Sequence, residues 1–199
     1  MPDLTQEIHN YAMESDDNLI VFVQTARSFD KLRKKLISGF AQKLEEKLKQ
    51  KYPTIKGWMV DDRTLIENPL KMNSLLTIRH ESWLQNLKVG IGMQKPIYYG
   101  IYWKEYKSLF PGRGKDIFEL MNNKNFDNRS RKDEWFPWFI QNEERFGDWF
   151  REETLVSMRQ VVRGEPPAEI LNFFYDKFVV IIEALDRYLN PVAGRDIER

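Results

Sequence analysis

The stretch LLTIRHESWLQNLKVGIGMQKPIYYGIYWK, residues 75–104, determines the fold class, because its apolar residues recur at every second position. Residues 87–93 alternate between apolar and small or polar side chains, and the same alternation resumes over residues 97–103. A period of two is typical of a strand that is buried on one face. The two runs therefore predict an antiparallel hairpin.

The register of this hairpin follows from which residues share a face. If the apolar residues of both runs lie on one face, the loop between the strands has an odd number of residues. The segment Gln94-Lys95-Pro96 fits this condition and pairs Met93 with Ile97. The register of every other pair in the hairpin is then fixed.

The opposite face of the hairpin carries glycines near its centre. In the predicted register Gly90 lies opposite Gly100, and Gly92 lies opposite Tyr98. Glycine inside a strand often marks the close approach of another backbone or of a ligand. A closely packed helix and a ligand groove are therefore the two alternatives for this face, and under the second one these four residues are candidate binding residues.

Composition limits the classes of function that are open to the chain. Its 199 residues include 31 Lys and Arg against 30 Asp and Glu, so no global field attracts a polyanion or a membrane surface. Cysteine is absent and there are two histidines, which excludes disulfides and thiol chemistry and leaves mainly carboxylates for any metal. The first residues of the sequence lack the basic and apolar regions typical of a secretory signal, and no apolar run approaches roughly 18 to 20 residues. We expect a cytoplasmic protein that does not contact a membrane and carries no cofactor.

The remaining pattern is mainly helical. Residues 3–14 and 19–52 show apolar residues at helical spacing, and residues 15–18 offer a break with a fresh cap. Lysines and arginines concentrate in residues 31–51, where a solvated helix face is favoured over a nucleic-acid contact. Pro53 ends the long helix because proline has no backbone N–H to continue the helical hydrogen bonds.

We expect an α+β fold with long N-terminal helices, an antiparallel sheet of three to four strands, and C-terminal helices packed on the sheet. The chain is predicted to be a single domain, residues 1–199. Its parts are a helical arm (1–52), the sheet (53–107), a loop-rich aromatic segment (108–147) and C-terminal helices (148–190).

A metal-dependent nuclease is one alternative for the function. Glu105 and Lys107 form an E-x-K sequence directly after a predicted strand, and Asp61 and Asp62 follow an earlier one. In PD-(D/E)xK nucleases two acidic residues hold a divalent cation and the lysine activates the attacking water. Mg²⁺ or Mn²⁺ would then be the cofactor. Against this, the E-x-K sequence here lies at the end of a strand, whereas the nuclease motif lies within a central one.

A second candidate site combines basic and aromatic residues. Arg129, Arg131 and Lys132 lie close to Trp135 and Trp138 in the sequence. Single-stranded nucleic acid is bound by this combination, because cations contact the backbone and aromatic rings stack on bases. Burial of the same aromatic rings in the core or in a small interface is the favoured alternative.

The order of these features resembles a known family. A long helix is followed by strands that read Leu-Lys-Val-Gly-Ile-Gly and Tyr-Tyr-Gly-Ile-Tyr, and by a Trp-Phe-Pro-Trp segment ahead of terminal helices. Over residues 8–190 this order is similar to the C-terminal half of bacterial PD-(D/E)xK nuclease-superfamily proteins. Their catalytic motifs lie in the N-terminal half, so the resemblance implies an accessory module and carries over no catalytic residue.

The sequence therefore predicts a non-enzymatic recognition or assembly module. Its partner would be a protein, or alternatively a nucleic acid, bound through the glycine face or the tryptophan segment. The metal-dependent nuclease and a purely structural or oligomerising domain remain the two alternatives, and the oligomeric state stays open.

Overall fold

The computed structural model describes residues 4–93, 96–103, 113–122, 130–131, 138–141 and 145–190. The chain divides into two compact units, Met1–Lys35 and Leu36–Arg199. Helices and an antiparallel sheet are both present, so the expected α+β class is confirmed. None of the helices in the described part of the chain is long and apolar enough to cross a membrane.

The first unit consists of α1 (Leu4–Met13) and the beginning of α2 (Asp16–Lys51). Ser15 separates the two helices and caps the second, because its Oγ accepts a hydrogen bond of 3.1 Å from the backbone N–H of Asn18. The Asn18 side chain in turn donates to the carbonyl oxygen of Tyr11 at 3.0 Å and so ties α1 to α2. The predicted break and the cap at Ser15 are confirmed, but α2 begins at Asp16, three residues before the expected start. We call residues 4–35 the N-terminal arm.

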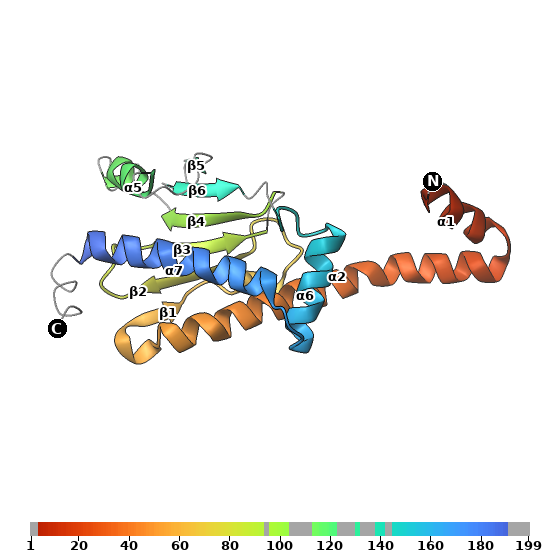
Figure 1. Ribbon diagram of the computed structural model, residues 1–199, viewed down its shortest axis with the longest axis horizontal. Coiled ribbons are helices and arrows are strands. Elements are labelled where there is room, and N and C mark those ends of the chain that lie inside the picture. Colours follow the sequence, from red (N-terminus) through yellow and green to blue (C-terminus); the bar gives the residue numbers. More distant parts are fainter. Residues whose placement is uncertain are drawn as a thin grey trace. The chain divides into compact units, whose positions relative to one another are not determined.

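The second unit is built on a six-stranded sheet with the order β1-β2-β3-β4-β6-β5, in which every described pair is antiparallel (Figure 1). The strands are β1 (Trp58–Val60), β2 (Leu75–His80), β3 (Leu87–Gly92), β4 (Tyr98–Trp103), β5 (Ser130–Arg131) and β6 (Trp138–Gln141). The expected number of three to four strands was too low. The two additional strands are short and lie in the segment that was predicted to be loop-rich, where a period of two has too few residues to be recognised.

The predicted register of the central hairpin is confirmed. Gly90 pairs with Gly100, Gly92 pairs with Tyr98, and Val89 pairs with Ile101. The core face of the sheet is therefore the apolar one, with fully buried side chains at Val89, Ile91 and Ile101. We call the opposite face, which carries the glycines, the glycine face.

Helices of the second unit cover the core face. α7 (Glu169–Leu189) lies across the sheet in Figure 1, and it contacts β3 and β4. Its buried aromatic residues join the cluster formed by the sheet and the second half of α2; Phe174, for example, packs edge to face on Phe40 and on Tyr99. The other helical elements are η1 (Thr54–Lys56), α3 (Thr64–Glu67), α5 (Arg113–Asn122) and α6 (Glu152–Arg163).

Candidate functional site

The glycine face is filled by side chains of its own sheet. A Cβ on Gly100 would lie 2.5 Å from the Cα of Phe139, and one on Gly90 would lie 2.7 Å from the Thr77 methyl group. A Cβ on Gly92 would overlap the ring of its cross-strand partner, Tyr98. Neighbouring side chains therefore occupy the space above Gly90 and Gly92, and the backbone of β6 approaches Gly100 closely. This is a third outcome beside the helix and the ligand groove. The binding role of these glycines and of Tyr98 stays a prediction.

Asp61 and Asp62 lie beside the glycine face and are both engaged there. The Asp61 carboxylate forms ion pairs with Lys88 and, at 3.8 Å, with Arg79. The Asp62 carboxylate accepts hydrogen bonds from the backbone N–H and the hydroxyl of Thr64, at 2.9 and 2.7 Å, in the turn that precedes α3. These contacts give both carboxylates a structural role.

A tyrosine shares this environment. The Lys88 Nζ stands 5.7 Å from the ring centre of Tyr102, and burial together with the nearby Asp62 carboxylate raises the pKa of the Tyr102 hydroxyl. Glu105 and Lys107, the other two nuclease candidates, lie outside the described residues. Within the described ranges no three His, Asp or Glu side chains gather as metal ligands.

The basic and aromatic cluster is only partly described. Trp138 is fully buried on the core side, and its indole N–H donates to the Asn122 side chain at 3.3 Å. Trp138 is therefore a core residue and not a base-stacking residue, because a buried indole cannot stack on a base at the surface. Arg131 lies in β5, and Arg129, Lys132 and Trp135 lie outside the described residues.

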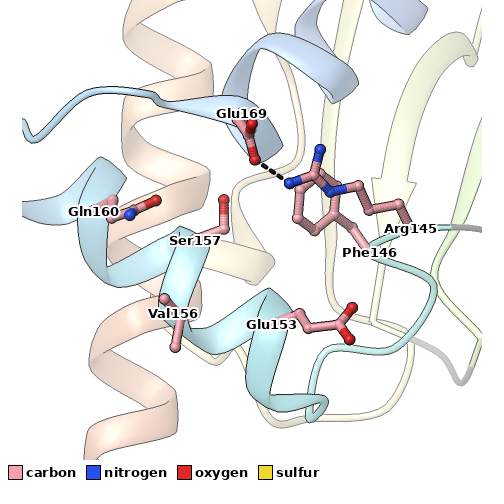
Figure 2. Close-up of a pocket in the computed structure, with 7 residues that line it drawn as sticks. All are labelled: Arg145, Phe146, Glu153, Val156, Ser157, Gln160 and Glu169. Carbon is pink, nitrogen blue, oxygen red and sulfur yellow. Dashed lines mark hydrogen bonds and ion pairs between the residues drawn. The ribbon is translucent and has the colours of Figure 1, made fainter.

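A pocket of about 320 Å³ opens between the segment before α6, α6 itself and the start of α7 (Figure 2). The Arg145 guanidinium forms an ion pair with Glu169 and stands 4.9 Å from the ring centre of Phe146. Ser157 Oγ accepts a hydrogen bond of 3.3 Å from the backbone N–H of Ile170, at the first turn of α7. The lining residues are Arg145, Phe146, Glu153, Val156, Ser157, Gln160 and Glu169. Sequence analysis missed this pocket because its residues come from separate segments that share no motif.

The N-terminal arm exposes far more apolar surface than any other part of the described chain. Of the fourteen large apolar side chains that are exposed among the described residues, nine lie on the arm. They are Ile8, Tyr11, Met13, Leu19, Ile20, Val21, Phe22, Phe29 and Leu32. Ala12 is the only arm residue with a described side chain that is buried. Exposed apolar side chains that gather on one segment often mark an interaction site.

These side chains include a regular seam along α2. Leu19, Phe22, Ala26 and Phe29 follow one another at spacings of three and four residues, which is the heptad spacing of helices that pack side by side. The heptad spacing continues through Arg33, which interrupts the apolar seam, to Leu36 and Phe40, where α2 contributes to the core of the second unit. The apolar pattern of the buried part of α2 thus has a counterpart in residues 19–29, where Leu19, Phe22 and Phe29 are exposed.

Charges are distributed unequally along the arm. Its first part carries the acidic residues Glu7, Glu14, Asp16 and Asp17 and no lysine or arginine. Its last part carries Arg27, Lys31, Arg33, Lys34 and Lys35 against the single acidic residue Asp30, which pairs with Arg33 at 3.1 Å. The arm thus has an acidic end and a basic end with an apolar seam between them. Sequence analysis predicted the helices of the arm but not that their apolar side chains would be exposed.

Comparison of the chain with models of protein families, with curated protein sequences and with solved structures found no match in any of the three.

Proposed function

We propose that this protein is a non-enzymatic assembly module that binds another polypeptide through its N-terminal arm. The observation that carries the proposal is the set of nine exposed large apolar side chains on α1 and the first half of α2. An exposed amphipathic helix is the surface that a second helix or an apolar groove recognises, through residues three and four positions apart. The seam from Leu19 to Phe29 has this form.

The amount of apolar surface suffices for association. Complete burial of a large apolar side chain stabilises by roughly 1.5 to 3 kcal/mol, so burial of the exposed half of one such side chain contributes about 1 kcal/mol. Nine such contributions are comparable to the estimated ~4 to 15 kcal/mol that association costs in lost freedom of motion. Burial of part of this apolar surface therefore supports the proposal that the arm binds a polypeptide partner.

The other proposals of the sequence analysis have less support. The nuclease alternative needs Asp61 or Asp62 for a cation, whereas lysine, arginine and threonine side chains hold both carboxylates. Nucleic-acid binding depends chiefly on cations that contact phosphates, and the seam of the arm is apolar. An accessory role beside a PD-(D/E)xK nuclease, which the resemblance implies, is compatible with an assembly module and stays part of the proposal.

Site-specific photo-crosslinking in cells that express the full chain tests the proposal. A photoreactive amino acid is placed at Phe22 or Phe29 on the arm and, as the control, at Ile55 or Met72. The control side chains are 93% and 77% exposed, which is more than either arm position, yet they lie outside the arm. We expect protein adducts chiefly from the arm positions. Equal yields from both pairs of positions, or no protein adduct from the arm, would contradict the proposal.

A further inference from the structure

We propose that the partner of the N-terminal arm is the same arm of a second copy of this chain, in antiparallel orientation. This inference rests on the assembly function proposed above and names its partner. Three properties of the arm support it: the distribution of charge, the order of large and small residues in the seam, and the symmetry that both imply.

The charge distribution favours antiparallel pairing. If two arms run in opposite directions, the acidic end of each copy, with Glu14, Asp16 and Asp17, lies beside the basic end of the other, with Lys34 and Lys35. In a parallel pair the like charges would face each other at both ends. Like charges that face each other across an interface select against that orientation, so the arm favours the antiparallel one.

The seam fits the same orientation. An antiparallel pair whose two-fold axis passes near Gln24 places Phe22 opposite Ala26 and Leu19 opposite Phe29. The small side chain of Ala26 then leaves room for the phenyl ring of the facing copy. Phe22 and Ala26 thus pair a large residue with a small one, which allows the side chains to interdigitate, and Leu19 opposite Phe29 adds apolar contact on either side.

Two-fold symmetry makes every favourable contact occur twice. In an isologous interface both copies use the same patch, so one acidic end and one basic end per chain create two oppositely charged contacts per dimer. No second protein is needed to place an opposite charge beside either end of the arm. The assembly closes at two copies unless further surfaces contribute.

Charge reversal in the full chain tests the orientation, with the self-association constant measured by analytical ultracentrifugation. We expect the natural chain to form a concentration-dependent dimer. We expect Asp16→Lys combined with Asp17→Lys to weaken the dimer by roughly tenfold or more, since each change removes a contact between opposite charges at both ends. Lys34→Glu combined with Lys35→Glu should weaken it similarly. The variant with all four reversals should regain most of the affinity.

A matched control separates pairing from local damage to the helix. Glu152 and Glu153 are exposed acidic residues in the first turn of α6, as Asp16 and Asp17 are in the first turn of α2. Reversing both to lysine changes the net charge and the helix N-terminus in the same way, but outside the arm. We expect this control to leave the association constant unchanged.

The possible outcomes separate this inference from the proposed function. A monomer at all concentrations whose arm crosslinks to a different protein would overturn self-pairing and leave the assembly function standing. A dimer that Asp16→Lys with Asp17→Lys does not weaken would overturn the antiparallel orientation. An arm that crosslinks to no protein, or only to nucleic acid or lipid, would overturn both proposals.

Discussion

At the scale of single residues, the glycines of the sheet differ in what surrounds them. Gly100 lies against the backbone of β6, where a Cβ would come within 2.5 Å of the Phe139 Cα and of the Trp138 carbonyl oxygen. Gly90 lies against the side chain of Thr77 instead. A side chain yields more readily than a backbone that is held in a sheet, so the two positions tolerate an added methyl group differently.

We therefore expect Gly100→Ala to reduce the free energy of unfolding by about 1 to 3 kcal/mol. Gly90→Ala should reduce it less, because the nearest atom to the added methyl group belongs to the Thr77 side chain and not to the backbone. Urea denaturation of the two variants beside the natural chain measures the difference. Equal losses, or a larger loss for Gly90→Ala, would show that the contact between Gly100 and β6 is not the tighter one.

Tyr52 makes the stability of the folded chain depend on pH in the alkaline range. Its side chain is buried, and its hydroxyl has no hydrogen-bond partner among the described residues. Burial, followed by the charges of Glu183 and Asp186 and by Tyr175, raises the pKa of this hydroxyl well above its ordinary value of 10.0. Above that ordinary value the unfolded chain loses a proton that the folded chain keeps, so stability is complete below about pH 10 and falls as the pH rises further.

Tyr52→Phe should remove this part of the pH dependence. At neutral pH the variant should be at least as stable as the natural chain, because it deletes a buried hydroxyl that has no partner. Denaturation midpoints between about pH 8 and pH 11 show the effect, with the exposed Tyr11→Phe as the control. If Tyr52→Phe and the natural chain lose stability in parallel above pH 10, Tyr52 does not cause the loss.

At the scale of elements, α2 has two halves with the same pattern and different surroundings. Leu36, Phe40 and Leu44 lie in the core, whereas Leu19 and Phe29 are exposed. A helix that buries little is marginally stable by itself in water, and its amides open locally without unfolding the rest. The two halves of α2 should therefore respond differently to association.

We expect amide hydrogen exchange over residues 19–32 to slow as the protein concentration rises, because pairing buries this half. Exchange over residues 36–48 should stay slow at every concentration, since the core already buries it. Mass-spectrometric exchange on dilute and concentrated samples measures both ranges at once. Protection over residues 19–32 that is independent of concentration would indicate that the arm does not depend on a partner.

Elements also show what the sequence could and could not predict. The β3–β4 register was predictable because the alternation of Val89 and Ile91 with glycines permits one arrangement of faces. β6 was missed because a four-residue strand with Trp138 and Phe139 gives no periodic signal.

The exposure of the arm was not predictable either, since a helical period indicates which residues prefer burial and not which chain buries them. Asp61 and Asp62 were located correctly after a strand, but Lys88, which forms an ion pair with Asp61, is distant in the sequence.

At the scale of the whole molecule, the net charge influences how readily copies associate through the exposed arm. The chain has a formal net charge of +1 at pH 7, so copies repel one another only weakly. A near-neutral protein that exposes a seam of Leu19, Phe22 and Phe29 lacks the colloidal protection that a large net charge provides.

If the arm mediates assembly as proposed, it should affect solubility as well. The arms of newly made chains are unpaired, and their apolar side chains can contact one another at random angles. The proposed antiparallel pairing then competes with disordered aggregation. Substitutions that weaken pairing would then lower the yield of soluble protein even though the sheet and its core are intact. Partner concentration would limit how much of this protein a cell can hold in solution.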